Sequence, residues 1–233
     1  MIDIKVLGSS SKGNCYLVDD GSTRLLLECG ISYKEIQKGL NFQTSTIDGC
    51  LVSHEHGDHT KAAKEVMKAS IDIYTAMGTQ EFLNLSSHRI KTIQAMKQFT
   101  IGTWTILPFE TQHDAAEPLG FLLQNQTGEK LLFATDTYYI KYKFSGLTHI
   151  MIEANYSIDI LNENVATGRV PTSMKKRLLK SHFSLEHVKD FLRANDLSKV
   201  KEIWLLHLSD TNSDADMFKR EIMELTGKIV HVA

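Results

Sequence analysis

A dense cluster of potential metal ligands follows one apolar stretch of the sequence. The run reads Ser53-His54-Glu55-His56-Gly57-Asp58-His59. Zinc binds imidazole nitrogen and carboxylate oxygen, and residues two apart in an extended segment point the same way, so His54 and His56 can share one ion. Asp58 and His59 can then face a second ion. Gly57 is expected to let the backbone turn tightly between the two pairs.

The alternative interpretation of this run is a polar surface loop in which Asp58 simply caps the helix that follows. Such a loop does not need three histidines at this spacing. Three further residues of ligand type strengthen the metal interpretation, because each follows a predicted strand: His113, Asp136 and His207. Taken singly, each is more typical of a hydrogen-bonded loop residue. Together with the cluster, they predict a site presented at one edge of a sheet by a rigid scaffold.

The elements that must position these residues alternate between strand and helix patterns. Period-two or short apolar runs predict strands at 3–7, 14–18, 24–28, 49–52, 71–74, 103–107, 120–124, 130–134, 202–206 and 228–232. Amphipathic runs predict helices at 33–40, 61–69, 158–164, 173–179, 185–193 and 215–225. The first strands are expected to be antiparallel, because a turn at Asp20-Gly21 joins two of them. The pattern favours an α/β fold in which helices cover sheets, and a single domain over 1–233.

Composition and charge exclude several classes of protein. With 42% hydrophobic and 23% charged residues, the chain is predicted to be globular rather than disordered. The net charge of −2 gives no global attraction to nucleic acid, so any grip on a polyanion has to be local. No run is long enough for a membrane span, and a cytoplasmic location without a membrane partner is expected. Three cysteines, an odd number, predict buried reduced thiols. No oligomeric state is indicated.

At the level of motifs, the sequence resembles the metallo-β-lactamase superfamily, which has the signature H-x-H-x-D-H followed by later His, Asp and His residues. Within it the sequence is similar to the YycJ/WalJ-like branch, and more distantly to tRNase Z enzymes. The strings that carry this likeness are Gly8-Ser9-Ser10, Gly13-Asn14-Cys15, Leu27-Glu28-Cys29-Gly30-Ile31-Ser32, His113-Asp114-Ala115-Ala116-Glu117-Pro118, Thr135-Asp136-Thr137, Glu153-Ala154-Asn155 and His207-Leu208-Ser209.

The resemblance implies a four-layer αββα sandwich with two divalent metal ions. It places one ion on His54, His56 and His113 and the other on Asp58, His59 and His207. Asp136 would bridge the two ions, and a metal-bridging hydroxide would be the nucleophile. Zinc is the ion that these ligands favour, with manganese or iron as alternatives. Asp58 is therefore expected to be catalytic as well as a ligand.

A late histidine, His182, resembles the motif that YycJ-like proteins and tRNase Z enzymes carry near the scissile phosphate. The resemblance implies that it stabilises the transition state or protonates the leaving oxygen. The alternative is a histidine packed beside a helix cap, with Ser184 as the cap. Upstream, a basic run could track a phosphate backbone or simply be a solvated helix face with Met174, Leu178 and Leu179 toward the core. It comprises Lys175, Lys176, Arg177 and Lys180.

Two departures from the family pattern bear on the choice of substrate. Glu28-Cys29 stands where the superfamily usually has an Asp, and Tyr156-Ser157 stands where the branch usually has His-Asp. The leading hypothesis is a phosphodiesterase, most specifically a DNA exonuclease, with DNA or another phosphodiester as partner. The alternatives are a small-molecule phosphodiesterase acting on a cyclic nucleotide, a thioester or lactone hydrolase of the same fold, and a binding protein with a structural metal.

Overall fold

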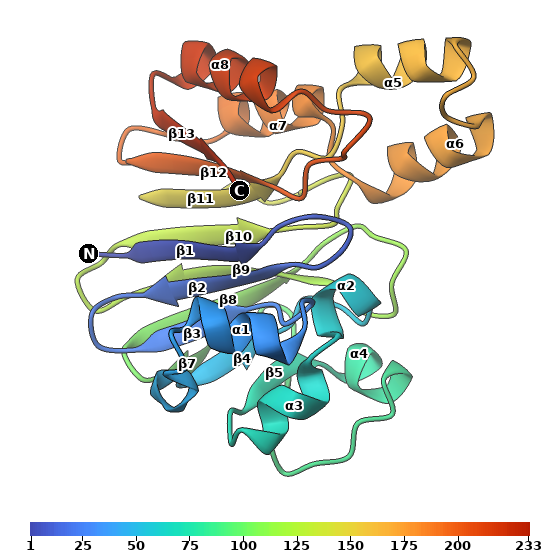
Figure 1. Ribbon diagram of the computed structural model, residues 1–233. Helices are drawn as coiled ribbons and strands as arrows, with labels where there is room; N and C mark the ends of the chain where they lie inside the picture. Colours follow the sequence, from blue (N-terminus) through green and yellow to red (C-terminus); the bar gives the residue numbers. More distant parts are fainter. The chain divides into compact units, whose positions relative to one another are not determined.

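The chain divides into two units in the computed structural model, which describes residues 1–233 (Figure 1). The first unit comprises Met1–Glu110 and Ala115–Glu129, and the second comprises Thr111–Asp114 and Lys130–Ala233. The single domain predicted over 1–233 stays a prediction. None of the helices has the length and apolar character that crossing a membrane requires.

A six-stranded sheet in chain order forms the centre of the first unit. Its strands are β1 (Asp3–Gly8), β2 (Cys15–Asp19), β3 (Arg24–Leu27), β4 (Gly49–Leu51), β5 (Ile73–Ala76) and β6 (Ile90–Ile93). The first three pair antiparallel, as predicted, and the pairs from β3 to β6 are parallel. Asp19 and Asp20 form the turn that joins β2 to β3 by accepting hydrogen bonds from the backbone of Gly21 and Ser22.

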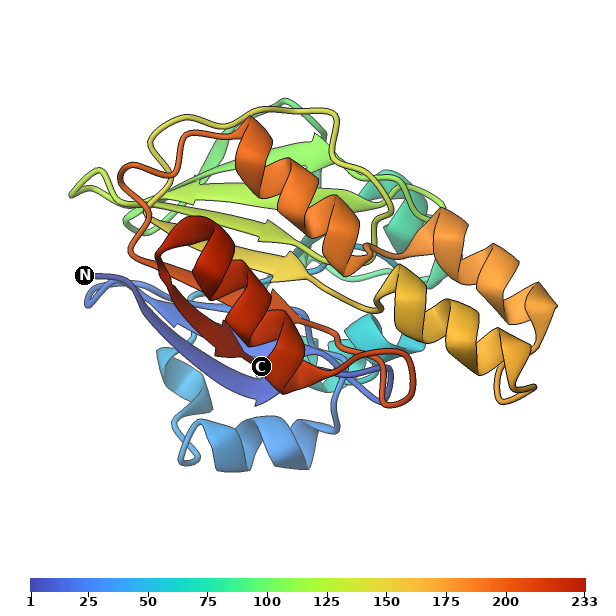
Figure 2. The same ribbon diagram turned by 90° about the horizontal axis from the view of Figure 1, so that it is seen from above.

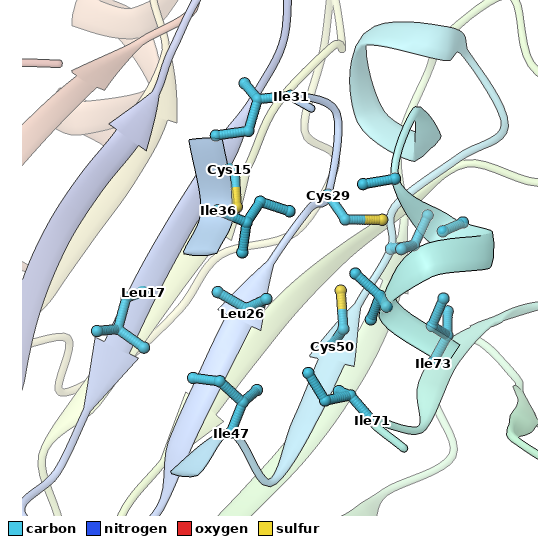
Figure 3. Close-up of a cluster of buried hydrophobic side chains, with 14 of the residues drawn as sticks. Cys15, Leu17, Leu26, Cys29, Ile31, Ile36, Ile47, Cys50, Ile71 and Ile73 are labelled. Carbon is cyan, nitrogen blue, oxygen red and sulfur yellow. The ribbon is translucent and has the colours of Figure 1, made fainter. Parts of the chain in front are cut away.

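Two helices of the first unit, α1 (Tyr33–Gly39) and α3 (Ala63–Lys68), pack an apolar core against this sheet (Figure 3). The unit's other helical elements are the short 3-10 turn η1 (Thr44–Thr46), α2 (Gly57–Thr60) and α4 (Met77–Phe82). Helix α1 begins with a capping box, in which Ser32 and Glu35 each accept a hydrogen bond from the other's backbone N–H. The three cysteines lie in this core as free buried thiols, as predicted.

Three more strands of the first unit form an antiparallel ribbon: β7 (Phe99–Ile101), β8 (Trp104–Glu110) and β9 (Leu119–Gln124). The fully buried indole of Trp104 donates from Nε1 to the carbonyl oxygen of Thr23 at 3.1 Å. Thr103 donates its backbone N–H to the hydroxyl of Thr23 at 2.9 Å. These bonds tie the start of β8 to the turn before β3.

The second unit is a parallel sheet with helices on its connections. Its strands, in spatial order, are β10 (Lys130–Ala134), β11 (His149–Glu153), β12 (Glu202–Leu206) and β13 (Ile229–Val232). Its helices are α5 (Ile158–Ala166), α6 (Thr172–Ser181), α7 (Leu185–Ala194) and α8 (Ala215–Thr226). Figures 1 and 2 show α7 and α8 side by side over this sheet. Because all four strands run the same way, their carboxyl ends meet at one edge.

Six short elements lie outside the ranges predicted from the sequence: η1, α2, α4, β6, β7 and β11. The most important of these is β11, whose five residues are all buried. A parallel strand covered on both faces shows no alternation of apolar and polar residues, which removes the signal that identifies a strand. The predicted helix at 61–69 is present as α3, but helical structure begins earlier, at Gly57, inside the histidine run.

Gly57 does not have the role predicted for it. It is the first residue of α2, its φ is not positive, and an added Cβ would meet nothing within 4 Å. The glycine that the histidine run needs is Gly30, after β3. A Cβ on Gly30 would lie 1.6 Å from the carbonyl oxygen of Asp58 and 2.7 Å from the backbone nitrogen of His59. The two backbones can approach so closely only because Gly30 has no side chain.

We therefore expect Gly30→Ala to lower the free energy of unfolding by about 3 kcal/mol, the upper end of the overpacking range, because the clash is with backbone that has to move. The matched change Gly57→Ala should leave stability unchanged or raise it by about 0.4 to 1 kcal/mol. Urea unfolding of both variants followed by circular dichroism measures the difference. Equal stability of the two variants would contradict this account of the loop.

Candidate metal centre

The histidine run of the first unit gathers three imidazoles where β4 ends and α2 begins. The ring centroids of His54 and His56 lie 4.6 Å apart, and those of His54 and His59 lie 4.2 Å apart. His54 Nδ1 is 2.9 Å from the hydroxyl oxygen of Ser53, which leaves Nε2 as its other ring nitrogen for a ligand role. Asp58 is not a helix cap, since His56 occupies the N-cap position of α2 without a side-chain cap bond.

His59 is oriented by residues from β3 and from the segment before β2. The amide Nδ2 of Asn14 lies 3.3 Å from His59 Nε2, and a carboxylate oxygen of Glu28 lies 3.6 Å from His59 Nδ1. Glu28 also accepts the backbone N–H of Ser53 at 3.2 Å. Glu28, one of the two departures from the family pattern, is thus a fully buried carboxylate beside the histidine run. Neither Glu28 nor Asn14 was assigned a role from the sequence, although both belong to strings that carry the resemblance.

The remaining carboxylate of the run, Glu55, has a structural role. It accepts the backbone N–H of Ala116 at 2.7 Å and lies 3.4 Å from the hydroxyl of Thr79. These bonds join the histidine run to α4 and to the segment before β9. These contacts give Glu55 a structural role in joining the three segments.

In the second unit, the predicted ligands lie at the shared edge of the parallel strands. Ile152 of β11 pairs with Ala134 of β10 and with Leu205 of β12, so the residues just beyond these positions meet. Asp136 Oδ2 is 3.6 Å from His113 Nε2, and Asp136 Oδ1 is 3.8 Å from His207 Nδ1. The structure thus brings together His113, Asp136 and His207, which are separated by many residues in the sequence.

Two of these ligands have backbone conformations that L-residues rarely adopt. Asp136 has φ 45° and His207 has φ 54°, and Glu28 of the first unit has φ 65°. Glu28 and His207 directly follow β3 and β12, and Asp136 is the second residue after β10. Conformations of this kind cost about 1 to 3 kcal/mol each and persist where the surrounding structure holds them, often at functional sites.

A second buried carboxylate, Glu153 at the end of β11, holds the late histidine. Its oxygens accept the backbone N–H groups of Thr137 at 3.0 Å and Phe183 at 3.1 Å. Its Oε1 lies 2.6 Å from His182 Nδ1 and 3.4 Å from His207 Nδ1. Asp136, Glu153, His182 and His207 each offer a ligand atom, and these atoms lie within 4.8 Å of one another. The role of Glu153 is not predictable from the motif Glu153-Ala154-Asn155 alone.

Asn155, two residues later, fixes the orientation of His207. Its Nδ2 donates to the carbonyl oxygen of His207 at 2.9 Å and lies 3.1 Å from His207 Nδ1. The ring of His182 stacks on that of His207, with centroids 5.6 Å apart and planes 8° from parallel. Ser184 caps α7 by accepting the backbone N–H of His187 at 3.2 Å, as predicted.

Burial and neighbouring charge shift the pKa values of three of these groups. Burial lowers the pKa of His113, and the nearby Asp136 only partly opposes this, so the ring is neutral near pH 7. Burial alone would also lower the pKa of His182, but the attraction of Glu153 outweighs it and the pKa is raised. For Glu153, burial would raise the pKa, yet the charge of His182 and the hydrogen bonds it receives lower it.

The chemistry of His113 and Asp136 fits a bound cation. His113 Nδ1 donates to the carbonyl oxygen of Ser181 at 2.8 Å, so the neutral ring presents the lone pair of Nε2 toward Asp136. Two acceptors 3.6 Å apart repel each other in buried surroundings. Two ligand atoms about 2.1 Å from a shared ion at a tetrahedral angle would be roughly 3.4 Å apart, close to this separation. A divalent ion would turn the repulsion into attraction.

Helix α6 carries the basic run and only part of its predicted core face. Leu178 packs into a small core with Tyr156, but Met174 and Leu179 are exposed, so their assignment to the core was wrong. The reason is that α6 packs against α5 rather than against a sheet, and so buries a narrow stripe. Arg177 Nε lies 3.9 Å from a carboxylate oxygen of Asp114, the residue after His113.

Comparison with known proteins agrees with this arrangement. A family model for the beta-lactamase superfamily domain matches residues 23–207. The chain is 27% identical over 242 aligned residues to Exodeoxyribonuclease YycJ of Bacillus anthracis, across 96% of this chain and 89% of the relative.

Two solved structures share the fold at low sequence identity. The metallo-β-lactamase fold protein YhfI of Bacillus subtilis matches with a TM-score of 0.76 and 16% identity, covering 100% of this chain and 95% of the other. Human tRNase Z, short form, matches with a TM-score of 0.63 and 13% identity, covering 90% and 93%. The predicted fold class and the YycJ/WalJ-like resemblance are confirmed. The chain therefore belongs to the beta-lactamase superfamily and is a metal-dependent hydrolase with the metallo-β-lactamase fold.

Proposed function

We propose that this hydrolase is a phosphodiesterase that binds two divalent metal ions and acts on DNA as an exonuclease. The observation that carries the metal assignment is the facing pair of acceptors, His113 Nε2 and Asp136 Oδ2, in buried surroundings. The similarity to a relative named as an exodeoxyribonuclease supports the choice of DNA. DNA is thus the expected partner.

The proposed ligands are the seven residues that the family resemblance implies. One ion is assigned to His54, His56 and His113, and the other to Asp58, His59 and His207, with Asp136 shared by both. Imidazole and carboxylate ligands favour zinc, and manganese or iron are alternatives because first-row ions compete for such sites. Divalent ions bound here would supply a hydroxide nucleophile at neutral pH and neutralise the charge that develops on the phosphate oxygens.

Asp58 has two parts in this proposal. As the partly exposed carboxylate of the histidine run, it would hold an ion that is accessible to solvent water. Its Oδ2 lies 3.5 Å from His59 Nε2, so both side chains can serve the same ion. We therefore assign it both a ligand and a catalytic role.

His182 is proposed as the proton donor to the leaving oxygen. Its Nδ1 is held by Glu153 at 2.6 Å, which fixes the ring and leaves Nε2 as the nitrogen that can meet a substrate. When water attacks phosphorus and the bond to the leaving oxygen breaks, that oxygen needs a proton, and His182 can donate it. Glu153 is a positioning residue in this scheme.

The grip on DNA has to be local, because the net charge of the chain is −2. Helix α6 offers Lys175, Lys176, Arg177 and Lys180 within one helix that ends next to His182. Lysine and arginine side chains contact phosphates without reading sequence. We propose that α6 contacts the backbone of the DNA near the scissile phosphate.

Metal content tests the proposed ligand set. The purified protein should bind two ions per chain, and Asp136→Asn should bind at most one, because the shared ligand loses its charge. Activity should fall at least about 100-fold, since even the loss of an outer hydrogen-bond partner of a metal site costs about 10- to 100-fold. Mass spectrometry of the metals gives the stoichiometry, with the exposed Asp159→Asn as control. Two ions in Asp136→Asn would refute the shared position.

The nuclease assignment predicts that a 5′-labelled DNA strand is shortened in the presence of Zn²⁺ or Mn²⁺, and that a chelator stops the reaction. Asp58→Ala and His59→Ala should abolish shortening while the protein stays folded by circular dichroism. Gel electrophoresis of the products measures both. If bis-p-nitrophenyl phosphate is hydrolysed but oligonucleotides stay intact under all metals, a small-molecule phosphodiesterase is favoured instead.

The role of His182 predicts a dependence on the leaving group. His182→Ala should lower kcat on DNA by about 10²- to 10⁴-fold, the usual contribution of a general acid, with unchanged metal content. Hydrolysis of bis-p-nitrophenyl phosphate should fall much less, because nitrophenolate leaves without a proton. Glu153→Gln should also lower kcat on DNA more than kcat on bis-p-nitrophenyl phosphate, but with a smaller difference. Equal losses on both substrates would argue against proton donation.

A further inference from the structure

The connection between β10 and β11 contains a run of alternating aromatic and basic residues that the proposed chemistry does not use. Residues 138–144 read Tyr-Tyr-Ile-Lys-Tyr-Lys-Phe. The run has no regular secondary structure, and it begins two residues after Asp136. Two adjacent aromatic side chains of this run are exposed: Tyr139 is 56% exposed and Tyr138 is 37% exposed.

Contacts at both ends hold this run in place. The hydroxyl of Thr137 donates to the carbonyl oxygen of Tyr139 at 2.9 Å and accepts the backbone N–H of the same residue at 3.3 Å. At the far end, Phe144 donates its backbone N–H to Asn195 Oδ1 at 2.7 Å. The ring of Phe144 lies 6.3 Å from that of Phe191 on α7. The buried Ile140 anchors the middle.

A pocket of about 350 Å³ lies between this run and α7, entirely within the second unit. Figure 2 shows the connection from β10 to β11 running beside α7, the orange helix. Among the lining residues are Tyr139, Lys141, Tyr142, Lys143, Phe183 and His187. The volume is enough for a ligand of nucleotide size, and the walls combine flat aromatic rings with cationic side chains.

We propose that this pocket binds a base and the adjoining phosphates of a single-stranded DNA end; the proposal rests on the nuclease function proposed above. Aromatic rings bind unstacked bases by stacking, whatever the base, and lysines follow the phosphates. Tyr139 provides the exposed ring, and Lys141 and Lys143 provide the charges. Lys141 Nζ lies 5.1 Å from the centroid of the Tyr142 ring, so charge and ring surface are combined in one wall.

The charges around the pocket favour an anion. Asp190 is its one acidic lining residue, and Arg193 pairs with that carboxylate at 3.1 Å. His187 adds a group that can donate a hydrogen bond. The charged groups at the pocket are therefore two lysines and one aspartate that an arginine pairs with. Their sum is positive and attracts a polyanion.

The pocket is connected along the chain to residues of the proposed chemistry. Phe183, one of its walls, follows His182 directly, and its backbone N–H binds Glu153 at 3.1 Å. At the other wall, Thr137 joins Asp136 to the aromatic run. Phe183 directly follows His182, and Thr137 directly follows Asp136. Both connections from the proposed catalytic residues therefore continue into segments that line the pocket.

Binding of two labelled oligomers tests the proposal. One oligomer is ten thymidylates, and the other is ten abasic units with the same phosphates. The affinity of each is measured by fluorescence anisotropy. The protein is metal-loaded His182→Ala, which is expected to cleave the oligomers slowly. The thymidylate oligomer should bind about tenfold tighter, the effect of one stacked base. Tyr139→Ala should remove this preference and Tyr139→Phe should keep it.

A lysine variant distinguishes the contribution of charge to DNA binding from that of base stacking. Lys143→Ala should weaken binding of both oligomers to a similar extent and reduce the slope of log affinity against log salt by about 0.7, the value for one lost phosphate contact on a single strand. Two exposed residues of the first unit serve as controls, Phe82→Ala and Lys34→Ala, and neither should change binding.

The outcomes distinguish this proposal from the proposed function. If the wild-type protein cleaves neither DNA nor bis-p-nitrophenyl phosphate, the phosphodiesterase assignment fails, whereas the binding preference still reports on the pocket. Equal affinity for the two oligomers, or a preference that survives Tyr139→Ala, would overturn the pocket proposal while leaving the phosphodiesterase assignment untouched.

Discussion

Repulsion between two buried carboxylates at neighbouring strand ends is the main electrostatic constraint in the second unit. Asp136 is 3% exposed and Glu153 is fully buried, and each destabilises the charged form of the other. Burying such charges is costly unless donors and cations surround them. Glu153 is stabilised by two backbone N–H groups and by His182. Asp136 accepts the hydroxyl of Thr135 at 2.8 Å and lies 3.6 Å from His113 Nε2, where we propose a divalent cation as a further partner.

The geometry of the strand ends explains why three residues of the candidate site have unfavourable backbone conformations. Parallel strands place their carboxyl ends at one edge, but side chains there alternate in direction with the pleat. A residue with positive φ one or two positions after the strand turns its side chain out of that alternation. Glu28, Asp136 and His207 all have this conformation. The strain is sustained by rigid, buried strands on either side, which is how a scaffold holds a site within a fraction of an ångström.

How far the sequence predicts the site depends on whether the signal is local. The histidine run, the three later strand-end ligands and the cap at Ser184 are recognisable from short stretches, and the fold class follows from motifs that span the chain. Glu28, Asn14 and Asn155 act only through contacts with residues distant in sequence, so their roles are not visible before the fold is known. Gly57 and Gly30 illustrate the same limit. The need for glycine depends on what lies opposite its missing Cβ, and Asp58 lies opposite Gly30.

The second departure from the family pattern, Tyr156, concerns packing more than metal chemistry. Its ring is fully buried with Leu161 of α5 and Val170, and Leu178 of α6 packs against the same group. Its hydroxyl has no hydrogen-bond partner, and burial raises its pKa well above the usual range, so it is a neutral phenol. An unsatisfied buried hydroxyl costs about 1 to 3 kcal/mol, which the ring's apolar contacts offset. Where the branch usually has a histidine, Tyr156 provides a buried ring that packs α5 and α6 together. Because α6 supplies both the carbonyl that orients His113 and the basic run, this packing acts on the site indirectly.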